Sequence, residues 1–188
     1  MQFDILFTSD LKRAKEKYLR CDDKRGLATA CFGLSTCYIC TSEFRKAEDV
    51  LSEVYGLWES LDDYRKCEYY SEMIYIKINL DEYDQAKSLA DECVAKMSHS
   101  IYMPWVEVMN TYVKLGLLVQ AREVMTHIRN IPNEDNDGYF AVRKAELFAA
   151  CGEFEQAYLL EHECIDNIWN QDKFAVESNI RHVDARIA

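Results

Sequence analysis

An all-α fold built from paired helices is predicted by three features of the sequence. Apolar residues recur at three- and four-residue steps through most of the chain, as they do on one face of an α-helix. Only two prolines and six glycines occur among the 188 residues, which suits helices joined by short turns. The sequence lacks the alternating runs rich in valine, isoleucine and threonine that mark β-strands.

The clearest helix pair lies at residues 104–130. Pro104 suits the first turn of a helix, where its missing N–H costs no hydrogen bond. Gly116 interrupts the apolar pattern, as a glycine just past a helix end does, and Pro132 follows the second helix. The first apolar face holds Trp105, Val108, Met109, Tyr112 and Val113, and the second holds Leu118, Ala121, Val124, Met125 and Ile128.

This helix pair repeats along the chain. A phrase around a central alanine occurs as DLKRAKEK, EFRKAEDV, EYDQAKSL, LLVQAREV and EFEQAYLL. The central alanines, separated by 33, 39, 35 and 36 residues, are Ala14, Ala47, Ala86, Ala121 and Ala157. A period in this range indicates stacked two-helix units, none of which buries its apolar face alone. The alanine suits a crossing at which two helices come too close for a larger side chain.

The repeat resembles the tetratricopeptide repeat (TPR) family, whose unit is about 34 residues long. The third full repeat matches best, with an aromatic, an aromatic, a glycine and an alanine at Trp105, Tyr112, Gly116 and Ala121. The fourth offers Ala145, Gly152, Phe154 and Ala157, and the first offers Ser35, Tyr38, Phe44 and Ala47.

The second repeat departs from the family pattern. It keeps Tyr83 and Ala86, but Ile74 stands where a small residue is usual and Asp81 where glycine is usual. The resemblance covers roughly residues 25–170. It implies an α-solenoid, a right-handed superhelix of antiparallel helix pairs.

We expect the whole chain, residues 1–188, to form one TPR-like domain. Helices are expected near residues 10–21, 25–40, 44–61, 64–79, 83–97, 101–115, 118–130, 138–151, 154–169 and 173–187. They form full repeat units at 25–61, 64–97, 101–130 and 138–169, with a partial unit at 10–21 and a terminal helix at 173–187.

Both ends of the chain read as incomplete repeats. Residues 10–21 read as the second helix of a unit whose first helix is shortened to residues 3–7 or absent. Residues 173–187 read as a first helix without a partner. Such a helix can cap the stack. It can equally mark a larger protein trimmed at this point, and both interpretations stay open.

Charge and hydropathy argue against two classes of partner. The net charge of −11 makes nucleic acid a poor partner, because phosphate contacts need clustered lysine and arginine. No stretch of about eighteen apolar residues is present, so we expect no membrane partner. The N-terminus lacks the basic and apolar regions of a secretory signal. A protein or peptide partner is expected, and the oligomeric state is not predicted.

The eight cysteines are expected to be reduced packing residues. Cys21, Cys93 and Cys164 each lie seven residues after a repeat alanine, on the same helix face. Such use of cysteine favours a reducing, cytoplasmic compartment. Cys37 and Cys40 have the spacing of a redox or zinc motif, but they lie within an expected helix without a second pair nearby, so packing is the favoured interpretation.

The sequence contains no recognisable enzyme, cofactor or metal motif. His99, His127, His162 and His182 fall in different repeats. The loop NEDNDG at residues 133–138 imitates the start of a calcium-binding loop, but Lys144 stands where that loop needs its bidentate glutamate. We therefore expect a protein that is not an enzyme, with no catalytic residues, no cofactor and no metal site.

Function is expected to reside in a groove lined by the first helix of each unit. In the TPR family this concave face commonly binds an extended peptide or a partner helix, as the resemblance implies. The expected groove residues, counted from the repeat alanines, are Phe32, Thr36, Ile39, Ser71, Tyr75, Ile78, Val106, Asn110, Val113, Tyr139, Val142 and Glu146. The alternative is that an adjacent helix of this chain, such as residues 173–187, fills the groove.

A subset of the TPR family grips the C-terminal carboxylate of chaperones with lysine, asparagine and arginine. The corresponding positions here include Phe32, Thr36, Glu72, Met103 and Glu107. Two acids at these positions would repel a carboxylate, so that role is not expected. The amide of Asn110 could instead bond a peptide backbone.

The leading hypothesis is therefore a non-catalytic scaffold for protein–protein interaction, which binds a peptide or partner helix in an apolar groove. The alternative is a sensory or regulatory TPR domain of a larger bacterial signalling protein, such as a transcription regulator or sensor kinase. The incomplete ends and the irregular repeat spacing motivate this second interpretation.

Overall fold

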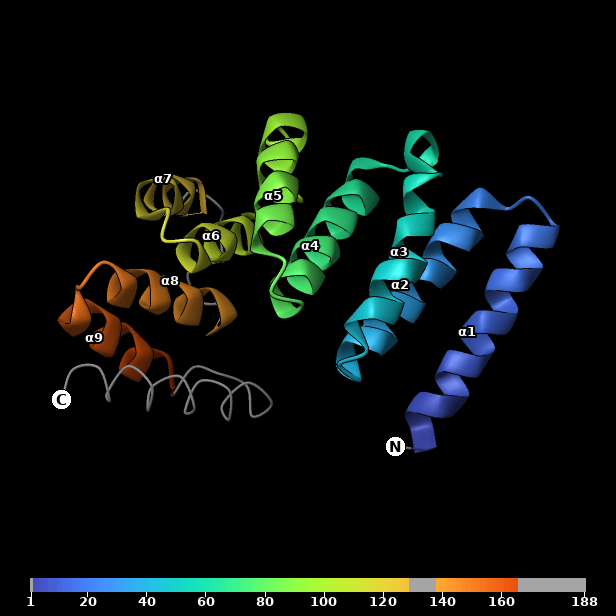
Figure 1. Ribbon diagram of the computed structural model, residues 1–188, viewed down its shortest axis with the longest axis horizontal. Helices are drawn as coiled ribbons and strands as arrows, with labels where there is room; N and C mark the ends of the chain where they lie inside the picture. The colour runs from blue at the N-terminus through green and yellow to red at the C-terminus, as the bar shows by residue number, and fades with distance from the viewer. Residues whose placement is uncertain (1, 129–137, 166–188) are drawn as a thin grey trace. The chain divides into compact units, whose positions relative to one another are not determined.

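The computed structural model describes the backbone of residues 2–128 and 138–165, and the side chains of residues 8–128 and 141–160 (Figure 1). Every regular element within these residues is helical, which confirms the all-α prediction. The elements are α1 (Gln2–Arg20), α2 (Lys24–Cys40), α3 (Phe44–Tyr55), the short 3₁₀ helix η1 (Trp58–Ser60), α4 (Asp63–Asn79), α5 (Tyr83–Met97), α6 (Trp105–Lys114), α7 (Leu118–Ile128), α8 (Gly138–Ala150) and α9 (Phe154–Ile165).

The chain forms two compact units. Unit 1, Met1–Pro104, holds α1 to α5, and unit 2, Trp105–Ala188, holds α6 to α9. Consecutive helices pack as pairs, α2 with α3 and α4 with α5 in unit 1, and α6 with α7 and α8 with α9 in unit 2. Within unit 1, α3 also contacts α4, and within unit 2, α7 contacts α8. This pattern of neighbouring pairs is compatible with a helical repeat.

Three expected helix boundaries were wrong. The N-terminal segment is one continuous helix, α1, rather than a helix starting near residue 10. The third expected helix ends at Tyr55, and Trp58 in the following turn packs edge-on against Tyr69 and Tyr70 of α4, which a continued helix would not allow. The helix expected from residue 101 begins at Trp105, because Pro104 keeps the preceding residue out of the helical conformation. The helix expected at 173–187 lies outside the described residues.

The turn between the two helices of each pair contains one residue in the left-handed backbone conformation. Ser42, Asp81, Gly116 and Gly152 have φ angles of 58°, 58°, 70° and 77°. Each lies five residues before the repeat alanine of its pair. The N–H that follows bonds the carbonyl five residues back over 2.8–2.9 Å, in the pairs Glu43–Tyr38, Glu82–Lys77, Leu117–Tyr112 and Glu153–Phe148. This bond defines the Schellman helix ending, so all four pairs share one local geometry.

Asp81, at the position where Gly116 and Gly152 stand in the later pairs, therefore does not change the turn. Aspartate tolerates the left-handed conformation better than most residues. Oδ1 of Asp81 also accepts a hydrogen bond of 2.8 Å from the hydroxyl of Tyr83. Ser42 adopts the same conformation with an exposed side chain. The turns at Ser42 and Asp81 thus carry a backbone strain that the turns at Gly116 and Gly152 avoid.

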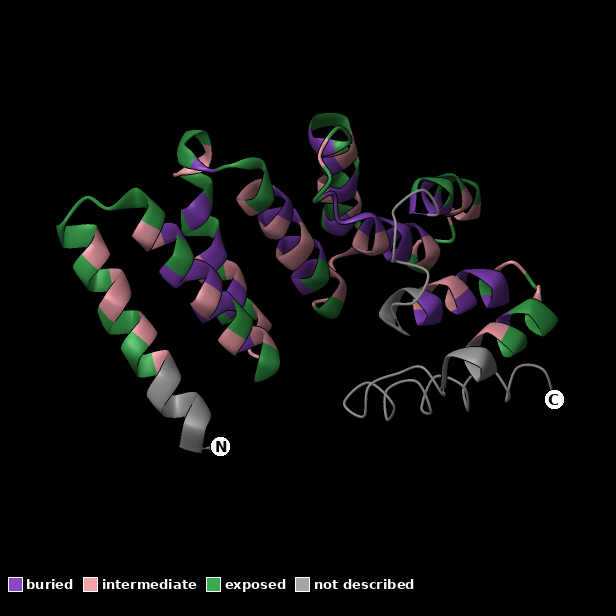
Figure 2. Cartoon of the chain, turned by 180° about the vertical axis from the view of Figure 1, so that it is seen from behind, coloured by how far each residue is buried: buried purple, intermediate pink, exposed green. Residues whose placement is uncertain are grey.

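The repeat alanines of the four pairs lie in the core, where the two helices of a pair approach each other most closely. Ala47, Ala86, Ala121 and Ala157 are each 0% exposed, as the sequence pattern predicts. Ala14 is only half-buried, because α1 packs chiefly against α2. Figure 2 shows buried residues on α2 to α5, whereas the described side chains of α1 include none. The repeat alanines therefore mark helix crossings within the four pairs, and this pattern does not extend fully to Ala14 on α1.

A stripe of small residues on α2 receives α1. A Cβ atom at Gly33 would lie 3.1 Å from Cδ2 of Leu11, and one at Gly26 would overlap the ring of Tyr18. Gly26 and Gly33 lie seven residues apart, on one face of α2. Ala30 between them is also buried. The absence of side-chain bulk along this stripe lets α1 approach α2 closely.

A buried lysine joins three elements of unit 1. Lys77 on α4 is 5% exposed, and its Nζ pairs with Glu82 at 2.6 Å and with Glu48 on α3. Arg45 on α3 pairs with the same two carboxylates, at 2.9 Å to Glu48. Desolvation opposes the charge on Lys77, but the hydrogen bonds that it donates to Glu48 and Glu82 prevail and raise its pKa. A buried cation of this kind is tolerated because it has partners on two sides.

We expect opposite effects from exchanging residues at two equivalent turns. Ser42→Gly should raise the free energy of unfolding by about 0.5 kcal/mol, and Gly116→Ser should lower it by about 1 kcal/mol. Ser42 is exposed, and a Cβ at Gly116 would meet no atom within 4 Å, so packing does not contribute. Urea denaturation of both variants measures the effect. Changes of the same sign in both would contradict the shared turn geometry.

Overpacking at a repeat alanine should destabilise the fold. Ala121→Leu is expected to lower the free energy of unfolding by about 1–3 kcal/mol, because the fully buried site has no space for a larger side chain. The matched control is Gln120→Leu, which adds a leucine at the adjacent exposed position of α7. Thermal unfolding of both variants tests this. Equal melting temperatures for the two would show that the helices do not cross closely at Ala121.

Candidate functional site

The expected groove residues of unit 1 lie on two helices that contact each other, α2 and α4. We define the α2–α4 face by the six of them, Phe32, Thr36, Ile39, Ser71, Tyr75 and Ile78. Thr36 and Tyr75 are exposed, whereas Phe32 is buried, with 2% of its surface exposed. Ile39, Ser71 and Ile78 are half-buried. The face therefore offers apolar and hydroxyl groups to solvent over a buried phenylalanine.

A hydrogen bond crosses this face. The hydroxyl of Thr36 on α2 lies 3.1 Å from Oε1 of Glu72 on α4, at the solvent-exposed side. The same hydroxyl lies 3.0 Å from the backbone carbonyl of Phe32, one turn back on its own helix. A hydroxyl has one proton to donate, so these two acceptors compete for it. The carboxyl group of Glu72 is therefore held by a shared donor.

Glu72 is a half-buried carboxyl whose ionisation is disfavoured. Burial, with a smaller contribution from the nearby Glu68, raises its pKa from 4.5 to about 7. The hydroxyls of Ser35 and Thr36 and the charge of Arg65 act in the opposite direction but do not offset burial. Ser35 Oγ lies beside the carboxyl without a well-aligned hydrogen bond, and Oε2 of Glu72 is buried without a hydrogen-bond partner. Near neutral pH this carboxyl is therefore distributed between its two protonation states.

The neighbouring arginine is held away from Glu72 by other contacts. Arg65 pairs with Glu68 at 2.6 Å and lies over the rings of Phe32 and Tyr64, at 5.2 and 5.6 Å from their centroids. It also donates to the hydroxyl of Thr29 on α2, at 3.4 Å. These contacts join the start of α4 to α2 and fix one end of the face.

The expected groove residues of unit 2 lie on α6 and α8, which also contact each other. Val106, Val113 and Glu146 are half-buried, and Val142 is 6% exposed. Asn110 is 7% exposed, and its Oδ1 has no hydrogen-bond partner. Next to these residues on α8, Arg143 pairs with Glu146 at 2.8 Å. The side chain of Tyr139 lies outside the described residues.

Two of the positions compared with the chaperone-binding clamp, Phe32 and Met103, are part of the core. Met103 is 5% exposed, and its sulfur lies 3.5 Å from Cys93 Sγ in the interior of unit 1. Glu107 is half-buried on α6. Met103 therefore contributes packing rather than a ligand contact.

Sequence reasoning missed an aromatic cluster at the turn between α3 and α4. Tyr55, Trp58, Tyr69 and Tyr70 lie with neighbouring ring centroids 5.5–6.1 Å apart. Lys66 Nζ lies 5.7 Å from the Trp58 centroid. The sequence shows that Tyr55 lies three residues before Trp58 and that Tyr69 and Tyr70 are neighbours. It does not show the turn that brings these two pairs together.

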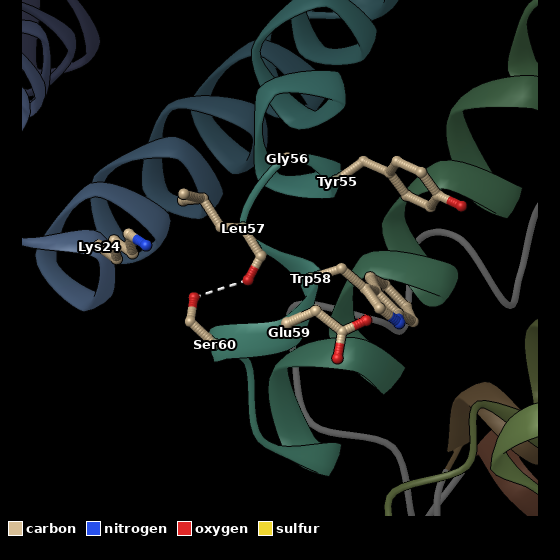
Figure 3. A pocket seen from close by; sticks show the side chains of 7 residues that line it. All are labelled: Lys24, Tyr55, Gly56, Leu57, Trp58, Glu59 and Ser60. Carbon is tan, nitrogen blue, oxygen red and sulfur yellow. Dashed lines mark hydrogen bonds between the residues drawn. The ribbon is translucent and has the colours of Figure 1, made fainter.

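An open hollow of about 490 Å³ lies beside this turn, lined by Lys24, Tyr55, Gly56, Leu57, Trp58, Glu59 and Ser60 (Figure 3). Tyr55 and Trp58 point to the same side of the turn, away from Leu57 (Figure 3). Ser60 donates a 2.6 Å hydrogen bond to the carbonyl of Leu57, which closes the turn from within. The side chains that line the hollow thus do not converge on one point.

The described cysteines are free thiols, and they divide by burial. Cys31, Cys67 and Cys93 are buried, and burial raises the pKa of Cys31 to about 11 and that of Cys67 above its usual value. The expected packing role is confirmed for Cys93 but wrong for Cys21, which is exposed at the end of α1, where α1 does not cross a second helix closely. The side chain of Cys164 lies outside the described residues. Cys37 is half-buried and Cys40 exposed.

Among the described residues, no three of histidine, cysteine, aspartate and glutamate lie close enough together to hold a metal ion. Residues 133–137 of the calcium-like loop lie outside the described residues. None of the described helices combines the length and the apolar content needed to cross a membrane. No protein-family model matches the chain, and a search of curated proteins finds no match.

The raised pKa of Glu72 predicts a pH-dependent contribution to stability. The folded chain binds this proton more tightly than the unfolded chain, so the contribution is fully present below about pH 4.5 and is lost as pH rises through about 7. Glu72→Gln removes the titration. Relative to the parent, the variant should gain up to about 3 kcal/mol between these two pH values. Urea denaturation of both chains across this range measures the difference. A difference that does not change with pH would show that the carboxyl is not desolvated.

Proposed function

We propose that this chain is a non-catalytic, TPR-like scaffold that binds a peptide or a helix of a partner protein. The α2–α4 face supports this proposal most directly. It combines the exposed Thr36 and Tyr75 with the half-buried Ile39, and it includes the incompletely bonded carboxyl of Glu72. A mixed apolar and hydrogen-bonding surface of this kind suits a polypeptide, which offers both side chains and backbone groups.

The regularity of the helix pairs supports a scaffold role. Four turns share the left-handed residue and the 6→1 hydrogen bond, and four alanines at the same phase are fully buried. Identical local geometry places equivalent residues of successive first helices in equivalent positions. In the proposed right-handed superhelix these positions line the concave side of each unit.

The ion pairs and the buried thiols support a non-catalytic role. Lys77 and Arg45 bind Glu48 and Glu82 across helices, and Arg65 is engaged by Glu68 and two rings. Such contacts hold the fold and leave the groups unsuited to proton transfer. The buried thiols fit the proposed cytoplasmic location, where cysteines stay reduced.

The proposal predicts that a charge introduced at Tyr75 on the α2–α4 face weakens peptide binding. Peptides are selected from a random dodecapeptide phage library on the full chain, and their affinities are measured by fluorescence anisotropy. Tyr75→Glu should weaken them at least about tenfold, because it buries a charge against apolar ligand atoms.

The matched control is Leu19→Glu, which places the same charge at an exposed apolar residue of α1, away from the α2–α4 face. Circular dichroism confirms that both variants are folded. The groove function is wrong if the library yields no binders, or if Tyr75→Glu and Leu19→Glu bind equally well.

A further inference from the structure

Two of the described thiols lie one turn apart at the end of α2. Cys40 is the last residue of that helix and is exposed, and Cys37 is half-buried. The cysteines that serve packing look different, because Cys31, Cys67 and Cys93 are all buried. Residues three apart on a helix are neighbours on its surface, so Cys37 and Cys40 share one face. Packing, which the sequence favoured for this pair, therefore does not account for it.

No other pair of this kind occurs among the described cysteines. The remaining thiols that are not buried are Cys21, which follows α1, and Cys151, which follows α8. Neither has a second cysteine within one helical turn of it in the sequence. Cys37 and Cys40 are thus the two described thiols that one helix places side by side within reach of solvent.

The backbone that carries these two thiols is held in place by the turn between α2 and α3. The N–H of Thr41 bonds the carbonyl of Cys37 over 3.2 Å, and the hydroxyl of Thr41 lies 3.1 Å from the carbonyls of both Cys37 and Tyr38. The N–H of Glu43 bonds the carbonyl of Tyr38 over 2.8 Å. The last turn of α2 is therefore closed, and Cys37 and Cys40 keep the spacing of a regular helix.

This spacing disfavours a disulfide but suits an ion that both sulfurs share. Cβ atoms three residues apart on a helix are about 5–6 Å from each other, whereas a disulfide needs a separation of about 3.5–4.5 Å. An ion between two thiolates holds their sulfurs roughly 4.6 Å apart at most, which is twice the metal–sulfur bond of about 2.3 Å found for zinc. Two side chains that point toward each other across one turn provide this separation without unwinding the helix.

The number and type of ligands select the kind of ion. Within the part of the chain that the structure describes, no third histidine, cysteine, aspartate or glutamate joins this pair to form a metal site. A structural zinc site uses four ligands, so the pair does not suit zinc. Thiolates are soft ligands that favour Cu(I), an ion that accepts two ligands in a linear arrangement.

We propose that Cys37 and Cys40 form a two-coordinate site for Cu(I) at the end of α2. Both thiols bind as thiolates, so each ion that is taken up displaces two protons to solvent, and no electron is transferred. The exposed Cys40 lets the ion enter, and the half-buried Cys37 holds it partly away from water. The site does not rest on the function proposed above, and neither ligand belongs to the α2–α4 face.

The test measures Cu(I) uptake by the full chain, without oxygen, in competition with bathocuproine disulfonate, whose Cu(I) complex is coloured. We expect the parent to take up one Cu(I) per chain. Cys37→Ser and Cys40→Ser should each weaken the affinity at least about 100-fold, because even residues that only orient a metal ligand contribute about 10–100-fold. Both changes together should abolish uptake at this site.

The matched control is Cys21→Ser, which removes an exposed thiol without a neighbouring cysteine and should leave the affinity unchanged. Circular dichroism confirms that each variant is folded. A second measurement offers Zn(II) to the parent in place of Cu(I). We expect no Zn(II) to remain bound after gel filtration, because two thiolates do not complete its ligand set.

Each other result overturns the proposal. Uptake of Cu(I) that neither substitution changes would place the ion on other cysteines. Uptake that only Cys40→Ser changes, with dimers that appear in sedimentation when Cu(I) is added, would show that two chains each contribute one thiol. A parent that takes up no Cu(I), or that retains Zn(II) through the same two thiols, would reject the two-coordinate site.

Discussion

The close crossing of the two helices in each pair is the constraint on which the rest of the structure depends. A fully buried alanine sets how near the helices come, and the left-handed residue five positions earlier sets where the second helix begins. Together they determine which side of the first helix is covered. Thr36, Tyr75, Asn110 and Glu146 all lie eleven residues before their repeat alanine, and their equivalence follows from this local geometry.

Equivalent positions do not have equivalent environments, however. Thr36 and Tyr75 are exposed in unit 1, whereas Asn110 in unit 2 is buried with an unbonded carbonyl oxygen. The difference arises from the side chains around them, because the backbone of the turns is the same. A helical repeat of this kind keeps its crossings constant and varies the residues that its first helices present.

The sequence was sufficient to predict the helices, their pairing and the buried alanines, because these depend on periodicity and on short-range turn chemistry. It did not predict where α3 ends, since that depends on Trp58 packing against rings about a dozen residues later. Cys21 was expected in the core because it lies seven residues after a repeat alanine, as Cys93 does. It is exposed, because α1 has no second close neighbour there. The desolvation of Glu72 was also missed. A glutamate on a helix is usually solvated, whereas burial in the folded chain desolvates this one.

Glu72 illustrates how a single desolvated carboxyl can reduce the stability of the fold that holds it. A glutamine at this position would keep the contact with Thr36 and could donate to Ser35 without any cost of ionisation. The carboxyl instead loses stability as pH rises through neutrality, because the charged form is desolvated and incompletely bonded.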